Sequence, residues 1–166
     1  MRAYVALGSN LDDPVAQVRA GAQALGKLAG TQLLCCSSLY RTAPVGITNQ
    51  PDFINAVCAI DTSTPAGALM QALLDIECAH GRQRAIPGGP RTLDLDLLLY
   101  GEFTCHEPGL TLPHPRLHER AFVLYPLAEI APGLNIPGHG RIETLLAGCT
   151  GQAIERLEPS NEISKP

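Results

Sequence analysis

Residues 92–100 read Thr92-Leu93-Asp94-Leu95-Asp96-Leu97-Leu98-Leu99-Tyr100, an alternation of apolar and acidic side chains that ends in an apolar run. A period of two is typical of a β-strand with one buried face, because successive side chains point to opposite sides. We therefore predict a strand here, with Asp94 and Asp96 side by side on one face. The predicted buried face consists of Leu93, Leu95, Leu97 and Leu99.

Five further elements are predicted upstream of this strand. The first predicted helix has a clear start signal, with Asp13 as the cap and Pro14 at the first helical position. With the strand at 92–100, the order becomes β-α-β-β-α-β, which is typical of a ferredoxin-like α+β fold with an antiparallel sheet and helices packed on one face. The predicted strands cover 2–8, 32–40 and 53–62, and the predicted helices cover 13–29 and 65–80.

The rest of the chain is predicted to decorate this core. We expect one domain over residues 1–160, with a flexible tail at 161–166, because 166 residues is an ordinary size for one domain. The expected decorations are a hairpin arm at 101–106, a proline-punctuated loop at 108–115, helical turns at 116–129, a short helix near 141–147 and a last strand near 152–157.

Charge and cysteine content limit the classes of partner. A net charge of −4 gives no bulk attraction to nucleic acid or anionic lipid. The chain shows no secretory signal and no run as long as a membrane span. None of the 6 cysteines forms a C-x-x-C pair, which argues against a structural zinc site. We expect a cytoplasmic monomer whose cysteines are mostly small apolar residues, and the sequence leaves open whether any of them pair.

The two neighbouring carboxylates predict a magnesium site. Like charges this close repel each other unless a cation lies between them. Oxygen ligands on a rigid strand suit Mg²⁺, which binds one or two carboxylates together with substrate phosphates. The alternative is an amphipathic strand with a solvated acidic face, and an isolated Asp-x-Asp pair favours that alternative.

An arginine-rich segment just before the strand favours the phosphate interpretation. Arg82, Arg84 and Arg91 fall in a stretch without Asp or Glu, and it also contains Pro87-Gly88-Gly89-Pro90. Arginine makes planar, bidentate contacts with phosphate, so the segment predicts an anionic small ligand. A solvated basic loop is the alternative for these residues taken alone.

Two other motifs were weighed as metal or phosphate sites. His114 and His118 are four apart, but Pro115 disfavours a continuous helix that could present both to zinc, and a phosphate-facing His114 with Arg120 fits better. The run from Gly21 to Lys27 matches a P-loop spacing but is followed by Leu28 instead of Ser or Thr, and it sits late in a predicted helix. We therefore reject a P-loop.

Several blocks in order resemble one family, the 6-hydroxymethyl-7,8-dihydropterin pyrophosphokinases of folate biosynthesis. The resemblance covers roughly residues 2–137, and its most specific part is Gly89-Pro90-Arg91-Thr92-Leu93-Asp94-Leu95-Asp96. The other blocks are Ala6-Leu7-Gly8-Ser9-Asn10-Leu11, Ser37-Ser38-Leu39-Tyr40-Arg41-Thr42, Gln50-Pro51-Asp52-Phe53-Ile54-Asn55-Ala56, Leu112-Pro113-His114-Pro115 and Pro126-Leu127-Ala128-Glu129-Ile130-Ala131-Pro132.

The resemblance implies transfer of the terminal diphosphate of ATP to the pterin hydroxymethyl oxygen, with release of AMP. It implies that Asp94 and Asp96 hold two Mg²⁺ ions and that Asp94 also orients the attacking hydroxyl. Arg82 and Arg91 are implied to be catalytic through phosphate neutralisation. The implied ATP-binding residues are Glu77, Arg82, Arg84, Arg91, Leu97, Thr111, His114 and Arg120.

The resemblance also implies a pterin pocket, in which Asn55 reads the ring edge and Phe122 stacks on the ring. Core packing is the alternative for Phe53 and Phe122. Where family members often carry an aromatic residue before Gly-Pro-Arg, this chain has Gly88, which implies a weaker lid. The implied pterin-binding residues are Gly8, Thr42, Ala43, Val45, Phe53, Asn55, Asp94 and Phe122.

A second hypothesis is a non-catalytic ferredoxin-like module that binds a nucleotide or metabolite as a regulator. A binding module would not need paired metal carboxylates beside a cluster of arginines, so the sequence favours the enzyme.

Overall fold

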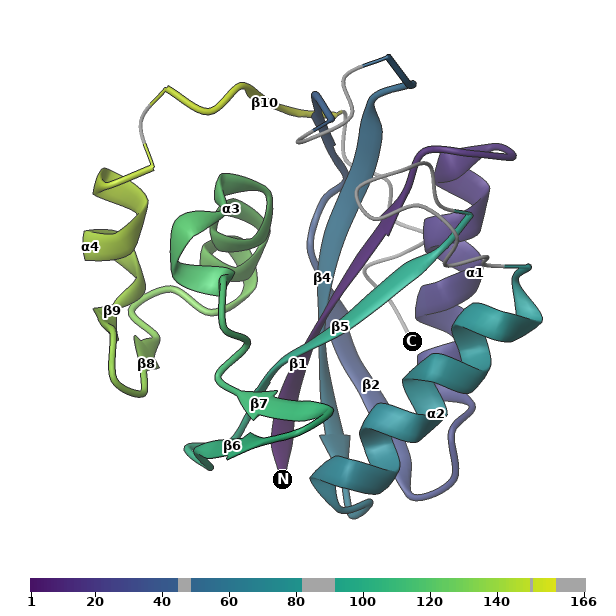
Figure 1. Ribbon diagram of the computed structural model, residues 1–166, viewed down its shortest axis with the longest axis vertical. Helices are drawn as coiled ribbons and strands as arrows, with labels where there is room; N and C mark the ends of the chain where they lie inside the picture. The colour runs from purple at the N-terminus through teal and green to yellow at the C-terminus, as the bar shows by residue number, and fades with distance from the viewer. Residues whose placement is uncertain (45–48, 82–91, 150, 158–166) are drawn as a thin grey trace.

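A central antiparallel sheet organises the computed structural model, which describes residues 1–44, 49–81, 92–149 and 151–157 (Figure 1). The strands run in the order β10-β3-β4-β1-β5, and β2 also pairs with β4. The strands are β1 (Arg2–Ser9), β2 (Thr31–Cys36), β3 (Tyr40–Thr42), β4 (Phe53–Thr62), β5 (Asp94–Tyr100) and β10 (Ile154–Arg156). The predicted strand at 32–40 is thus divided into β2 and β3.

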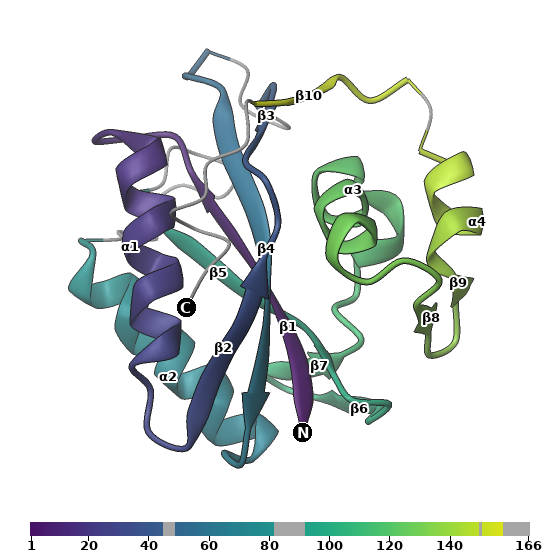
Figure 2. The same cartoon turned by 180° about the vertical axis from the view of Figure 1, so that it is seen from behind.

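The two helices of the core lie on one face of this sheet. They are α1 (Pro14–Gly26) and α2 (Ala66–Ala79), and Figure 2 shows them together on the side away from the later helices. The predicted start of α1 is confirmed, because Pro14 occupies its first turn and the Asp13 side chain accepts a hydrogen bond from the Ala16 N–H. Leu69 and Leu73 of α2 are fully buried against the sheet.

The C-terminal third of the chain covers the opposite face. Helix α3 (Ala121–Ile130) packs against β4 there, and its Leu124 and Leu127 are fully buried in a second apolar cluster. The remaining elements are β6 (Cys105–Glu107), β7 (Leu110–Leu112), the 3₁₀ turn η1 (Leu117–Glu119), β8 (Asn135–Ile136), β9 (Gly140–Arg141) and α4 (Ile142–Ala147). The sheet is therefore buried on both faces, with α1 and α2 on one side and α3 on the other.

A β-bulge corrects the predicted buried face of β5. Tyr4 opposes Leu99 but the next residue, Val5, opposes Leu97, so Leu98 is an extra residue in β5. Leu97 lies in the cluster under α1 and α2, whereas both Leu98 and Leu99 lie in the cluster under α3. The prediction that Leu99 shares a face with Leu97 is wrong, because the extra residue resets the alternation.

The hairpin after β5 also differs from the prediction. The hairpin arm expected at 101–106 is reduced to β6, which begins only at Cys105, and β6 pairs with β7 in a separate two-stranded sheet. Part of the predicted 108–115 loop is therefore a strand. Gly109, at the turn between the two strands, has φ +80°, a conformation that favours glycine.

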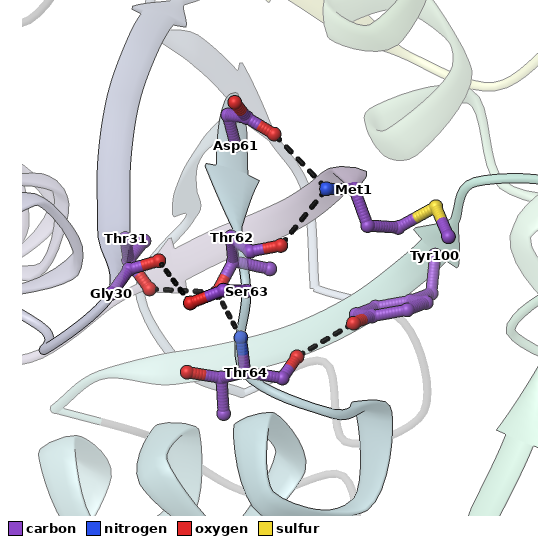
Figure 3. Close-up of polar contacts among 8 residues, drawn as sticks. All are labelled: Met1, Gly30, Thr31, Asp61, Thr62, Ser63, Thr64 and Tyr100. Atoms are coloured by element: carbon purple, nitrogen blue, oxygen red, sulfur yellow. Dashed lines mark hydrogen bonds and ion pairs between the residues drawn. The ribbon is translucent and has the colours of Figure 1, made fainter.

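One end of the sheet is closed by a polar network that Figure 3 shows in detail. The Met1 ammonium donates to Asp61 Oδ1 at 3.1 Å and to the Thr62 carbonyl at 2.9 Å. Tyr100 at the end of β5 donates its hydroxyl to the Thr64 carbonyl at 2.6 Å. The network joins the start of β1 to the ends of β4 and β5, so the other end of these strands is left for a site.

A disulfide bond corrects one expectation drawn from the cysteine content. Cys36 and Cys58 lie directly opposite each other on β2 and β4 and form a disulfide, so the expectation that the cysteines act mostly as small apolar residues does not hold for this pair. Free thiols are found at Cys35, Cys78, Cys105 and Cys149. Within the described residues, every helix is too short or too polar to cross a bilayer.

Close packing of α1 on the sheet generates a stability prediction. A Cβ at Gly21 would approach Leu7 Cδ2 to 3.1 Å and Leu93 Cδ1 to 3.2 Å, whereas a Cβ at Gly67 of α2 would meet nothing within 4 Å. Gly21→Val should lower the free energy of unfolding by about 1–3 kcal/mol through overpacking. Gly67→Val is the matched control and should be neutral or slightly stabilising, because valine has the higher helix propensity. Urea unfolding measures both, and equal effects of the two substitutions would contradict the close contact.

Candidate active site

The end of β1 lies between the beginnings of β4 and β5, and this brings three site positions into one row. Gly8 is the Cα partner of both Asn55 on β4 and Asp94 on β5. Opposed residues share a face, and Asp96 shares the face of Asp94. This is the α3 side of the sheet, because Leu95 between the two carboxylates belongs to the cluster under α1 and α2. The predicted pairing of the carboxylates on one face is therefore observed.

The carboxylate pair is accessible to a cation. Asp94 is partly exposed, and the Asp96 side chain is 36% exposed and lies 4.0 Å from His114 Nε2. Among the residues that the structure describes, no three His, Cys, Asp or Glu side chains gather as a metal cage. His118, which the sequence offered as a zinc ligand together with His114, stacks on His139 with 4.1 Å between the ring centroids. Two carboxylates without a cage fit Mg²⁺, which takes its other ligands from phosphates and water.

His114 is held beside the carboxylates by the bulge in β5. Its N–H donates to the carbonyl of Leu98, the extra residue of β5, at 2.9 Å. Burial, and next the positive charge of Arg120, lower the pKa of His114 to about 4. The ring is therefore neutral near pH 7. Its Nδ1 accepts the Arg116 N–H at 3.2 Å, so Nε2 carries the proton and can donate toward Asp96 or a ligand.

Glu77 supports the carboxylate strand from the opposite face. It lies near the end of α2 with only 2% of its surface exposed, and its Oε2 accepts the Leu95 N–H at 2.7 Å. Because β5 is an edge strand of the main sheet, that N–H has no partner strand on its outer side. The buried carboxylate thus fixes the backbone between Asp94 and Asp96.

Arg120 and Phe122 sit together at the start of α3. The Arg120 guanidinium carbon lies 5.4 Å from the centroid of the Phe122 ring, a cation–π contact. The Ala121 N–H between them donates to Gln152 Oε1 at 2.9 Å, which ties this turn to the segment before β10. A residue expected to contact ATP and one expected to contact pterin are therefore neighbours.

Two other residues expected near adenine occupy different settings. Thr111 lies on β7, partly exposed, opposite His106. The Leu97 side chain is 1% exposed and belongs to the cluster under α1 and α2. It therefore points away from the face of Asp94 and Asp96, and a contact with a ligand would have to come from its backbone.

The residues expected to bind pterin surround the start of β4. Asn55 Nδ2 donates to Thr42 Oγ1 at 2.8 Å, and both side chains are buried. Thr42 is the cross-strand partner of Phe53, which is partly exposed, and Ala43 just beyond is exposed. Asn55 Oδ1 lies only 3.0 Å from where a Cβ on Gly8 would stand. The amide is thus held between Thr42 and the backbone of β1.

Four expected residues lie outside the described residues. They are Val45, Arg82, Arg84 and Arg91, so the structure brings together the carboxylate and pterin positions and leaves the arginine positions to the sequence.

Sequence reasoning assigned no role to two polar side chains near the site, of which Asn10 is buried. Asn10 Nδ2 donates to Gln50 Oε1 at 2.8 Å and to the Pro51 carbonyl at 3.0 Å, which ties the end of β1 to the segment before β4. Glu129 of α3 accepts hydrogen bonds from Ser38 and Tyr40. Both residues stand in blocks that carry the family resemblance. That resemblance was the one signal in the sequence that could have identified them, because neither follows a strand or helix periodicity.

Comparisons with known proteins identify the family of this chain. A sequence model of the 7,8-dihydro-6-hydroxymethylpterin-pyrophosphokinase family matches residues 4–132. The chain is 47% identical over 156 residues to a 2-amino-4-hydroxy-6-hydroxymethyldihydropteridine pyrophosphokinase of Pseudomonas aeruginosa, covering 94% of this chain and 96% of the relative. It is 42% identical over 157 residues to the protein of the same name from Haemophilus influenzae, covering 95% and 98%.

Solved structures support the fold at lower identity. The wild-type HPPK-DHPS of Plasmodium falciparum superimposes with a TM-score of 0.68 at 14% identity, covering 89% of this chain and 44% of that one. This chain thus spans less than half of that longer protein, and the likeness shows the fold alone. The family match and the identities over nearly the full chain show that this protein belongs to the 7,8-dihydro-6-hydroxymethylpterin-pyrophosphokinase family.

Proposed function

We propose that this protein transfers diphosphate from ATP to the hydroxymethyl group of 6-hydroxymethyl-7,8-dihydropterin in tetrahydrofolate biosynthesis. The hydroxyl oxygen bonds to the β-phosphorus of ATP and releases its proton to solvent, while the bond from that phosphorus to the α-phosphate oxygen breaks and AMP leaves. The observation that carries the proposal is the row of Asn55, Gly8 and Asp94 across three adjacent strands.

This row suits an acceptor molecule that is hydrogen-bonded at one end and reacts at the other. Neighbouring strands are about 4.8 Å apart, so the backbones of Asn55 and Asp94 are separated by about 10 Å. A fused two-ring molecule can lie over Gly8 with its amide edge at Asn55 and its hydroxymethyl group near Asp94. In this arrangement Asp94 accepts a hydrogen bond from the hydroxyl and aligns its oxygen for attack.

On the nucleotide side, we propose that Asp94 and Asp96 hold two Mg²⁺ ions together with the ATP phosphates. When bound, Mg²⁺ neutralises phosphate charge and holds the phosphates in line with the attacking oxygen. His114 presents its Nε2–H near Asp96, where it can donate a hydrogen bond to a phosphate oxygen, and Arg120 adds positive charge. The other proposed ATP contacts are Thr111 and the backbone of Leu97. Glu77 is proposed to act indirectly, by fixing the backbone of β5 between the two carboxylates.

The arginine roles rest on the sequence. We propose that Arg82 and Arg91 neutralise the charge that develops on the phosphates, and that Arg84 also binds ATP. This division follows from arginine's bidentate match to phosphate and from the place of the segment next to the carboxylate strand.

The pterin pocket is proposed to consist of the residues around Asn55 and the aromatic ring of Phe122. Asn55 has its amide nitrogen engaged by Thr42, which favours one orientation for reading the ring edge. Arg120 covers part of the Phe122 ring, so the two substrates meet at neighbouring residues. The remaining proposed pterin contacts are Gly8, Thr42, Ala43, Val45, Phe53 and Asp94.

The fold class, the extent of the domain, the oligomeric state and the cellular location are also proposals. The strand order β5-β1-β4-β2, with α1 and α2 on one face, supports a ferredoxin-like core. We propose a single domain over 1–160 and a monomer, working in the cytoplasm, where its co-substrate ATP is abundant.

Product analysis tests the proposed reaction. Incubation with ATP, Mg²⁺ and 6-hydroxymethyl-7,8-dihydropterin should yield AMP and the pterin diphosphate in equal amounts, measured by ion-pair chromatography. Omitting the pterin or adding excess EDTA should stop AMP formation, because the acceptor or the cation is then missing. Formation of ADP in place of AMP, or no turnover by folded protein, would contradict the proposal.

The carboxylate role predicts a specific loss. Asp96→Asn keeps the side-chain shape but removes the charge, so kcat should fall by at least about 100-fold, while the far-ultraviolet circular dichroism stays unchanged. Asp75→Asn is the control, because this carboxylate is exposed on α2, lies outside the proposed site and accepts a hydrogen bond from the nearby Gln71 side chain. A rate for Asp96→Asn within threefold of wild type would rule out the metal role.

Gly8 predicts a defect confined to the acceptor. The methyl group of Gly8→Ala would displace Asn55 Oδ1, which lies 3.0 Å from the new carbon. The KM for the pterin should rise on the order of tenfold, because a few tenths of an ångström matter at a positioned hydrogen bond. The KM for ATP should stay within twofold. An unchanged pterin KM would mean that the ring does not contact Asn55.

A further inference from the structure

The side chain of Glu129, near the end of α3, accepts hydrogen bonds from residues that are far from it in the sequence. Its Oε1 accepts the Tyr40 hydroxyl at 2.6 Å. Its Oε2 accepts both the N–H and the hydroxyl of Ser38, at 2.9 and 3.0 Å. Arg156 of β10 adds an ion pair at 3.6 Å to Oε2 and donates Nε to the Ser38 hydroxyl at 3.1 Å. One carboxylate therefore joins α3, the β2–β3 connection and β10.

The hydrogen bond between Tyr40 and Glu129 is partly buried. Tyr40 is 6% exposed, and the Glu129 side chain is 24% exposed. Burial and the Glu129 carboxylate raise the pKa of Tyr40 well above its ordinary value, so its hydroxyl remains a donor at physiological pH. A charge-assisted bond of this kind is stronger than a neutral one, and loss of one partner leaves the other poorly solvated.

Tyr40 is directly connected to the proposed pterin pocket. It is the cross-strand partner of Asn55, and Thr42, two residues further along β3, receives the Asn55 amide hydrogen. Strand β3 contains only 3 residues. So short a strand has little pairing of its own to hold its position, and side-chain anchors count for more.

Helix α3 supplies the opposite wall of the same pocket. Phe122 and Glu129 are separated by seven residues, which is close to two helical turns, so both lie on one face of α3 about 10 Å apart. Glu129 therefore connects the helix that carries Phe122 to the strand that carries Thr42.

We infer that Glu129 is a positioning residue for the pterin substrate, which sets the spacing between Phe122 on α3 and the Thr42–Asn55 pair on the sheet through Tyr40 and Ser38. The inference rests on the proposed function and extends it to a residue that does not itself contact either substrate. ATP binding depends less on this spacing, because Asp94 and Asp96 lie on β5, on the other side of β1 from β4 and β3, and Arg120 is the one proposed ATP contact at the start of α3.

Steady-state kinetics of Tyr40→Phe and Glu129→Gln test the inference. Tyr40→Phe removes only the hydroxyl, and Glu129→Gln keeps the side-chain length but loses an acceptor. Each should raise the KM for the pterin by about three- to tenfold, with kcat and the KM for ATP within twofold of wild type. The double variant should be no worse than Glu129→Gln alone, since both changes break the same bond.

Glu143→Gln is the matched control. Its carboxylate on α4 accepts the Gly133 N–H at 2.8 Å and faces Arg141, so it is also hydrogen-bonded, but it does not contact the sheet residues of the pocket. It should leave both KM values unchanged. Fluorescence titration measures the Kd for the pterin in the presence of a non-hydrolysable ATP analogue. This Kd should rise in Tyr40→Phe and Glu129→Gln by the same factor as the KM for the pterin.

The outcomes separate this inference from the proposed function. If wild type forms no AMP, the proposed function fails. If wild type is active but the pterin KM stays within twofold in both variants, or both KM values rise together, the positioning role is wrong. If Glu129→Gln does not fold, the isosteric Tyr40→Phe alone decides by the same criteria.

Discussion

The antiparallel pairing of β1 with β4 on one side and β5 on the other is the constraint on which the whole site depends. It places the end of β1 beside the beginnings of both neighbours, so that Asn55, Gly8 and Asp94 form one row. The register of β5 against β1 matters to the site as much as the order of the strands. A slip of β5 by one residue would turn Asp94 and Asp96 toward α2 and bury two like charges, which costs far more free energy than the slip could recover.

Packing on both faces of the sheet holds this register. Leu93 and Leu95 are buried with α1 and α2, while Leu98 and Leu99 are buried with α3. Glu77 adds a polar constraint, because burying its carboxylate is tolerable only while it accepts hydrogen bonds such as that of the Leu95 N–H. The carboxylate strand is thus fixed by apolar contacts on each side and by a buried hydrogen-bond acceptor, Glu77, at its edge.

Local patterns could predict the elements but not their long-range contacts. Alternation at Asp94 and Asp96 correctly indicated one face, and Asp13-Pro14 correctly marked the start of α1. Alternation failed at Leu99, because a bulge depends on the partner strand and leaves no mark in the sequence. The pairing of Cys36 with Cys58, and the bonds of Glu129 to Ser38 and Tyr40, depend on the register of β2 and the placement of α3. No window of local sequence contains that information, although the blocks shared with the family included several of these residues.

The central claim is that the Asp94–Asp96 pair binds the metal ions that hold the transferred diphosphate. The most direct measurement is a crystal structure with Mn²⁺ in place of Mg²⁺, a non-hydrolysable ATP analogue and 6-hydroxymethyl-7,8-dihydropterin, with anomalous diffraction to locate the metal. We predict anomalous peaks within coordination distance of carboxylate oxygens of both Asp94 and Asp96 and of phosphate oxygens. Peaks coordinated only by phosphates and water, with neither carboxylate as a ligand, would contradict the account.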